Sequence, residues 1–243
     1  MADPAALPSK PRRVVTAPIC RRALAAAMLI ACVQPAWPQV APSPAELQAY
    51  TGLHRAAHQG DLPLIASASR SALEGRDSHR RTPLHVATFT RRRDAAAALL
   101  AAGADPGALD ADRYDAVTIA AVADDEQTLR VLLAGGASAK LVTSRYDGTA
   151  LIAAAHLGHA GVVRQLIAAG APLDHVNNLH WTASIEAVVL GDGGPRHQAT
   201  LQALLDAGAD HRLADREGRS PLQLARSRGY AAMVRMLEQA GAK

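Results

Sequence analysis

Histidines are the side chains of this chain that first suggest chemistry. The sequence contains ten of them, and imidazole nitrogens are common ligands of zinc and of haem iron. A site of this kind would draw on His156, His175, His180 or His197. The spacing is unlike that of a zinc motif, because His156 and His159 are separated by a predicted turn, with no cysteine or carboxylate close by in the sequence. A histidine-based metal or haem protein is therefore the alternative hypothesis, and no cofactor is expected.

Sequence motifs of enzymes are missing. The chain has no G-x-S-x-G, no H-E-x-x-H and no dinucleotide-binding fingerprint. Both cysteines, Cys20 and Cys32, lie in the first forty residues, so the remainder offers no thiol nucleophile and no disulfide. The glycine-rich stretch from Gly191 to His197 lacks the pattern of a phosphate-binding loop. We therefore predict a protein without catalytic activity.

A repeated pair of short helices must position whatever side chains do act. In the clearest copy, Thr149 is a predicted N-cap, Leu151 and Ala154 lie on an apolar helical face, and Gly158 ends the helix. A second apolar helix follows and ends at Gly170. Each helix of such a pair buries only one flank, so the unit needs a copy of itself on either side.

The copies recur along the chain. Equivalent predicted N-caps follow one another at intervals of 31 to 38 residues: Thr51, Thr82, Asp115, Thr149, Thr182 and Ser220. The stretch beginning at Thr82 reads T-P-L-H-V-A, and in it the chain resembles the ankyrin-repeat family, whose signature is T-P-L-H-x-A. The resemblance implies an all-α repeat solenoid in which helix-turn-helix units are joined by hairpin loops. It also implies that His54 and His85, at the signature position, hydrogen-bond the loop backbone.

Six repeats account for the chain from residue 47 onward, at 47–77, 78–110, 111–144, 145–177, 178–215 and 216–243. The first has Ser67 and Ser69 where apolar residues are expected, and the last has Glu238 at a position that is apolar elsewhere. We predict that these two repeats cap the stack. The fifth repeat is about five residues too long, and we expect its Gly191 to His197 insertion to bulge from the loop edge as a spacer or a protein-contact loop.

The first forty residues resemble an export signal. Their five basic residues against the single acid Asp3 precede a short apolar run from Ala23 to Val33, which is too short to span a bilayer. Two processing routes stay open: ordinary cleavage, or lipidation at Cys32, because Leu29 to Cys32 resembles a bacterial lipobox. Residues 41–46 read as a linker. The expected location is the periplasm, or the membrane as a tethered lipoprotein that faces the periplasm.

Charge outside the export segment is balanced. The remainder carries 21 basic and 21 acidic residues, so it has no electrostatic footprint for nucleic acid. The resemblance instead implies a protein partner, bound by a monomer in a concave groove that is lined by the hairpin tips and the exposed sides of the first helices.

Aromatic and arginine side chains concentrate at the predicted groove positions. Five of the six aromatic residues after residue 40 are there, and Tyr, Trp and Arg are frequent anchors of protein interfaces. The other reading is that the rings pack on adjacent hairpins and stiffen the stack. The predicted groove residues are Tyr50, His79, Arg81, Phe89, Tyr114, Arg145, Tyr146, Asn178, Leu179, Trp181, Arg216, Glu217 and Arg219. We expect an interaction scaffold in the bacterial cell envelope, either an escort or an inhibitor of an exported enzyme.

Overall fold

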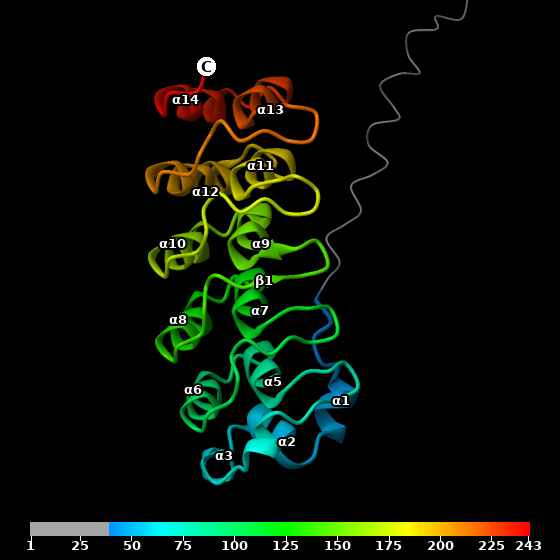
Figure 1. Cartoon of the computed structure of the whole chain (residues 1–243). Helices are drawn as coiled ribbons and strands as arrows, with labels where there is room; N and C mark the ends of the chain where they lie inside the picture. The colour runs from blue at the N-terminus through cyan, green and yellow to red at the C-terminus, as the bar shows by residue number, and fades with distance from the viewer. Residues whose placement is uncertain (1–38) are drawn as a thin grey trace, which may run out of the picture. The chain divides into compact units, whose positions relative to one another are not determined.

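Short antiparallel helix pairs make up residues 39–243, the part of the chain that the computed structural model describes. Cys32 and the rest of the predicted export segment lie outside the described residues. The pairs stack in sequence order, with their first helices in one column and their second helices in the next (Figure 1). Among the described residues, no helix is both long and apolar enough to cross a membrane. The arrangement is the all-α solenoid predicted from the repeats.

The helices have similar lengths along the stack. The first helices are α2 Gly52–Gln59, α5 Pro83–Phe89, α7 Ala116–Val122, α9 Ala150–Leu157, α11 Ala183–Val189 and α13 Pro221–Ser227. The second helices are α3 Leu62–Ala66 with α4 Arg70–Leu73, α6 Arg93–Ala101, α8 Glu126–Ala134, α10 Ala160–Ala168, α12 Pro195–Asp206 and α14 Ala231–Gln239. The remaining elements are α1 Pro44–Ala49 and the antiparallel strands β1 Val142–Thr143 and β2 Gly148–Thr149.

Each first helix begins directly after its predicted N-cap residue. The side chain accepts a hydrogen bond from the backbone N–H three residues later at Thr82, Asp115, Thr149, Thr182 and Ser220. Thr51 precedes α2 without making this bond. A side-chain cap of this kind contributes about 1 kcal/mol to helix stability. These caps therefore fix where five of the six first helices begin.

The turns between paired helices require a positive φ. Gly158 provides it at 69°, whereas Arg91 and Asp124 adopt φ values of 55° and 51° at the equivalent turns. A side chain in this region costs about 1 kcal/mol. Arg91 and Arg93 also lie 3.6 and 3.3 Å from the Asp125 carboxylate, so the next repeat balances the charge of the arginine-rich turn.

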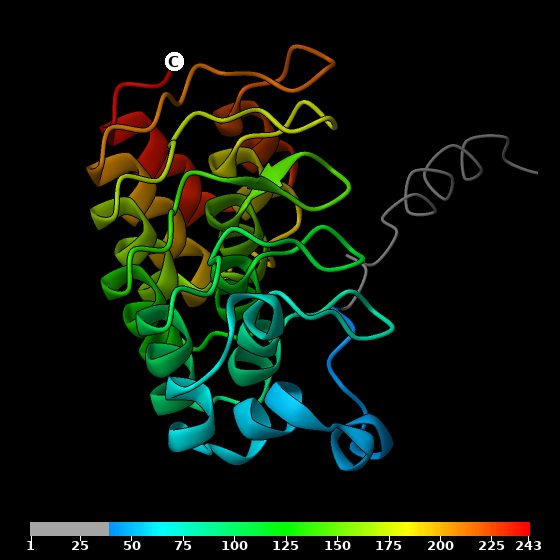
Figure 2. The same cartoon turned by 60° about the horizontal axis from the view of Figure 1, so that its bottom comes forward.

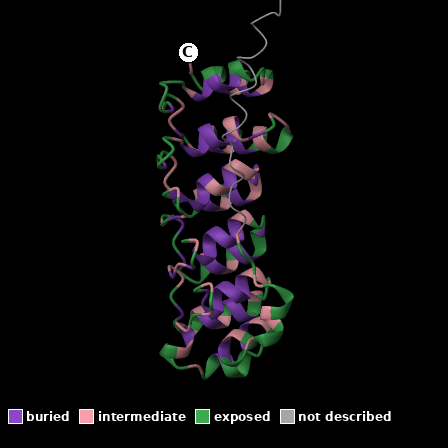
Figure 3. Ribbon diagram, turned by 90° about the vertical axis from the view of Figure 1, so that its right-hand side faces the viewer, coloured by how far each residue is buried: buried purple, intermediate pink, exposed green. Residues whose placement is uncertain are grey.

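Small and aliphatic side chains fill the space between the helices. One buried cluster runs from the first repeat into the fifth, and a second joins the fifth to the sixth. Figure 3 shows the buried residues along the helix pairs and the exposed residues at the hairpins and the two ends. At the carboxyl end, exposed Glu238 pairs with Arg226 at 2.7 Å. The charged end surface agrees with the predicted cap.

The amino-terminal segment differs from its prediction. Residues 41–46 were expected to be a linker, but α1 begins at Pro44, inside that range. Ser43 caps the helix, and Glu46 completes a capping box by accepting from the Ser43 N–H at 2.8 Å. The linker prediction is wrong for this segment, because its residues form a capped helix that contacts the second repeat.

The Gly191 to His197 insertion also differs from its prediction. It lengthens a helix: α12 starts at Pro195 and has 12 residues, against 9 in α10. His197 Nε2 lies 3.0 Å from the His156 carbonyl oxygen, and the Tyr230 hydroxyl donates to the Gly191 carbonyl at 2.9 Å. The predicted bulge from the loop edge is therefore wrong, because the inserted residues pack against the repeats on both sides. Its role as a spacer or a protein-contact loop stays a prediction.

Candidate functional site

A hydrogen-bond acceptor at the base of each hairpin shapes its tip. Asp77 Oδ1 accepts from the backbone N–H groups of His79 and Arg81, at 2.9 and 2.8 Å. The same pair of bonds, two and four residues onward, is made by Asp110, Ser144, Asn177 and Asp215. Short polar side chains favour such turns because they replace a backbone acceptor. Each tip therefore presents the residues before its N-cap in the same conformation.

Neighbouring hairpins are joined to one another. Backbone N–H groups of Ala111 and Asn178 donate to the carbonyls of His79 and Tyr146 in the preceding hairpins, both at 2.9 Å. Arg145 continues the contacts with an ion pair of 2.6 Å to Asp112. Figure 2 shows the hairpins along one edge of the stack. We call this edge, with the adjoining sides of the first helices, the hairpin face.

Part of the predicted binding surface is exposed on the hairpin face. The exposed members are Arg145, Asn178, Leu179, Arg216, Glu217 and Arg219, and the partly buried ones are Phe89, Tyr114, Tyr146 and Trp181. Leu179 is 40% exposed, which is high for a large apolar side chain. Trp181 also packs against the cluster of the last two repeats. The ring of Trp181 thus supports the stack as well as the surface.

Arg81 departs most clearly from its prediction as a groove residue. Its side chain is 0% exposed. Nε donates to Asp77 Oδ2 at 2.6 Å, Nη1 donates to the Val40 carbonyl at 3.1 Å, and Nη2 pairs with Glu46. The prediction that Arg81 lines an open groove is wrong, because the segment around α1 covers the guanidinium.

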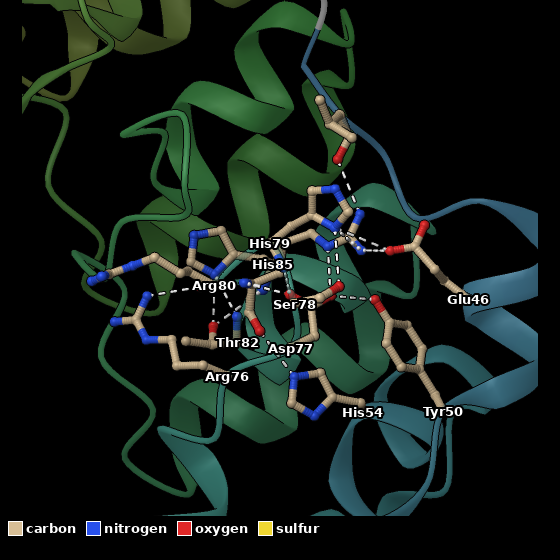
Figure 4. A network of polar contacts seen from close by, with 12 residues as sticks. Glu46, Tyr50, His54, Arg76, Asp77, Ser78, His79, Arg80, Thr82 and His85 are labelled. Carbon is tan, nitrogen blue, oxygen red and sulfur yellow. Dashed lines mark hydrogen bonds and ion pairs between the residues drawn. The ribbon is translucent and has the colours of Figure 1, made fainter.

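Tyr50 and His79 belong to the same polar cluster. The Tyr50 hydroxyl donates to Asp77 Oδ2 at 2.6 Å, and His79 Nδ1 lies 3.1 Å from Glu46 Oε1 (Figure 4). Glu46, Asp77 and His79 could together hold a metal ion by distance. The guanidinium of Arg81 already contacts all three side chains. The cluster is therefore an ion-pair network that contains its own cation.

Hydrogen bonds shift the titration of this network. The Ser43 backbone N–H, the Ser43 hydroxyl and Arg81 lower the pKa of Glu46 to about 2. Burial raises the pKa of Asp77, but hydrogen bonds from Tyr50 and Arg81 outweigh it and leave the pKa lowered. Burial and the bond to Asp77 raise the pKa of Tyr50. Both carboxylates are therefore charged at neutral pH, as their pairing with Arg81 requires.

The signature histidines have structural roles, as the resemblance implied. His54 Nε2 bonds the Arg81 carbonyl at 2.9 Å, and His85 Nε2 bonds the Tyr114 carbonyl at 3.1 Å. His85 Nδ1 accepts from the Thr82 N–H, which leaves the proton on Nε2. Burial lowers the pKa of His85 to about 4. Each histidine ties one repeat to the hairpin that follows it.

The histidines of the metal hypothesis do not converge. His175 Nε2 bonds the Asp147 carbonyl at 2.6 Å, while His197 bonds Asp192 and the His156 carbonyl. In the part of the chain that the structure describes, these residues form no group of three ligands. His156 instead lies 3.2 Å from Glu186.

Sequence reasoning missed three acidic residues. Glu46 and Asp77 both lie five residues before an N-cap, and this spacing recurs in Asp110, Asn177 and Asp215. This spacing and the capping-box pattern from Ser43 to Glu46 could have revealed Glu46 and Asp77. Glu186 is buried on α11 and accepts from Asn177 Nδ2 at 3.0 Å. It occupies a position that is apolar in most repeats, so no pattern pointed to it.

Comparison with known proteins places the chain in a family. Residues 117–215 match the model for ankyrin repeats in three copies, and residues 79–111 match the model for a single ankyrin repeat. The ankyrin repeat protein YahD of Escherichia coli (strain K12) is 33% identical over 190 residues, which cover 77% of this chain and 94% of YahD. The chain belongs to the ankyrin-repeat family.

Solved structures of ankyrin-repeat domains are similar to this fold. A domain from Acinetobacter baumannii AYE has a TM-score of 0.73 and 44% identity, over 79% of this chain and 98% of that domain. The ankyrin repeat domain of Bcl-3, a member of the IkappaB protein family, has a TM-score of 0.69 and 31% identity, over 80% and 87% of the two chains. Ankyrin repeats are in general non-catalytic protein-interaction modules.

Proposed function

We propose that this ankyrin-repeat protein is a non-catalytic scaffold that binds another protein on its hairpin face. The observation that carries the proposal is the exposure of Leu179 beside Tyr146 and Asn178 on neighbouring, hydrogen-bonded hairpins. Aromatic and apolar side chains on a rigid surface are suited to anchor a partner, because little conformational entropy is lost on binding.

The proposed setting is the bacterial cell envelope. The basic and apolar pattern before residue 40 supports export, followed by cleavage or by lipidation at Cys32. The partner would then be an exported protein, and we infer an enzyme whose activity the scaffold either supports or blocks. These two roles predict opposite changes in the activity of the partner when the scaffold is added.

Affinity capture from a periplasmic extract tests the proposal. The full chain serves as bait beside a Tyr146→Ala/Leu179→Asp variant. The matched control is Gln202→Ala on α12, one of the second helices, which we call the outer helices because they lie away from the hairpin face (Figure 1). A protein that the wild type and Gln202→Ala recover, and that the hairpin-face variant loses, supports the proposal. Recovery by all three baits would exclude this face. Adding the scaffold to the recovered enzyme then separates an escort from an inhibitor.

A further inference from the structure

The amino-terminal segment takes the place of a hairpin in the first repeat. We call residues 39–50 the strap. Glu46 lies five residues before the N-cap Thr51, as Asp77 lies five residues before Thr82. Instead of shaping a hairpin, Glu46 lies in the first turn of α1 and pairs with Arg81 in the hairpin of the second repeat, which we call the second hairpin. The strap is thus a helical segment seated on the hairpin face.

Polar contacts hold most of the strap. No residue of α1 is buried, and Leu47 and Tyr50 are only partly buried against the core. The polar contacts of the strap are those of Glu46 with Arg81 and His79, of the Val40 carbonyl with Arg81, and of Tyr50 with Asp77. The Tyr50 ring also lies 5.3 Å from the His54 ring. Segments with few buried apolar contacts open at a low free energy. We therefore expect the strap to lift without unfolding the repeats.

The second hairpin does not need the strap to organise its arginine. Arg219 is the equivalent residue of the last hairpin, and its backbone N–H and Nε bond Asp215 at 2.8 and 2.9 Å. Arg81 makes the same two bonds to Asp77, at 2.8 and 2.6 Å. The side chain of Arg219 is 52% exposed, so the arginine–aspartate pair forms without another segment packed over the arginine. When the strap lifts, Arg81 stays oriented and its outer nitrogens become available.

We infer that the second hairpin is a carboxylate-recognition site, which the strap fills in cis and which a partner segment with a glutamate in the first turn of a helix can occupy. The charge of Arg81 complements such a glutamate, and its planar guanidinium suits carboxylates. The chain itself shows the mode of binding through Glu46. This inference deepens the proposed function and rests on it, because it names the chemistry of the partner.

A peptide supplied in trans tests the site. The probe is a synthetic peptide of residues 39–50, titrated by NMR into the full chain and into its Glu46→Lys variant. Lysine next to Arg81 repels the strap, so the peptide should bind the variant at least tenfold more tightly than the wild type. A peptide with glutamine in place of glutamate, and a Glu46→Lys/Arg81→Gln protein, should both lose binding. Equal binding to the two proteins, or no binding to a folded variant, would overturn the inference.

Hydrogen exchange gives a second readout that needs no peptide. The Leu47 and Tyr50 amides, which bond the carbonyls of Ser43 and Glu46, should exchange faster in Glu46→Gln, while the α5 amides stay protected. Unchanged strap exchange would contradict the strap mechanism. Neither experiment uses Tyr146 or Leu179, so a failure of partner capture on those residues and a failure of the carboxylate site can be told apart.

Discussion

Arg81 and Arg219 occupy the same place in two hairpins and differ in what covers them. Each lies one residue before an N-cap and bonds an aspartate four residues earlier. Arg81 is fully buried beneath the strap, whereas Arg219 is half exposed beside Glu217. The same arginine–aspartate pair is therefore part of a buried contact in the second repeat and part of the exposed surface in the last repeat.

Replacing these arginines should have unequal costs. Arg81→Gln leaves the carboxylates of Glu46 and Asp77 without their cation, and we expect a loss of about 1–3 kcal/mol in the free energy of unfolding. Arg219→Gln removes a half-exposed arginine from the buried Asp215, which keeps its bonds from the Glu217 and Arg219 backbone N–H groups, so we expect a smaller loss of about 1 kcal/mol. Urea unfolding monitored by circular dichroism measures both. Equal losses would contradict the assignment of Arg81 to a buried network.

Acid should destabilise the protein through His85. Its pKa falls from an ordinary value of 6.5 to about 4 in the folded chain, so between these values the unfolded chain binds a proton that the folded chain does not. This contribution is complete above pH 6.5 and is lost as the pH falls toward 4, by at most about 1.4 kcal/mol per pH unit.

His85→Gln is the matched variant for the acid test. Gln223 stands at the equivalent position of the last repeat and makes the same capping box. The variant should keep its cap and show a flatter stability profile between pH 6.5 and 4. Urea unfolding at several pH values gives the two slopes. Identical slopes would show that His85 is not the titrating group.

How far the sequence determines this fold can be judged from single positions. Thr82, Asp115 and Ser220 cap helices where expected, because a capping side chain acts within one turn of its own helix. The fate of Arg81 depends on Glu46, 35 residues earlier. The length of the first repeat does not indicate that α1 takes the place of its hairpin. Helix caps could therefore be predicted from the sequence, whereas contacts between distant segments could not.

The fifth repeat illustrates the same limit. Its extra residues were countable, but their packing depends on Tyr230 in the next repeat and His156 in the one before. On the hairpin face, the repeat period correctly predicted which residues lie at the hairpin tips. The partial burial of Trp181 depends on its packing against the cluster that the fifth and sixth repeats share.

Gly191 should tolerate no side chain. A Cβ there would lie 2.2 Å from the Ala187 carbonyl oxygen and 2.7 Å from the His197 ring. We expect Gly191→Ala to shift His197 and to lower the free energy of unfolding by about 1–3 kcal/mol. Ala203→Gly in the adjoining α12 removes one partly buried methyl group and costs about 1 kcal/mol in helix propensity, so it sets the scale for the loss. A neutral Gly191→Ala would mean that the insertion is loosely packed.

Replacing His180 with glycine should stabilise the protein. His180 adopts a φ of 64° at the tip of its hairpin, where Gly218 adopts 75° in the next one. His180→Gly should stabilise the chain by about 0.5–1 kcal/mol, and Gly218→Ala should destabilise it by a similar amount, because only glycine takes this conformation without steric cost. The thermal unfolding midpoints of the two variants should move in opposite directions. A shift in the same direction would contradict this account of the hairpin tips.

Binding of a partner protein on the hairpin face is the central claim, and site-specific photocrosslinking in intact cells tests it most directly. A photoreactive amino acid is placed at Asn178 or Leu179, and at Arg164 or Gln202 on the outer helices as controls. We predict one discrete protein adduct from both hairpin-face positions and none from the outer helices. Adducts from Arg164 and Gln202 alone would contradict the account.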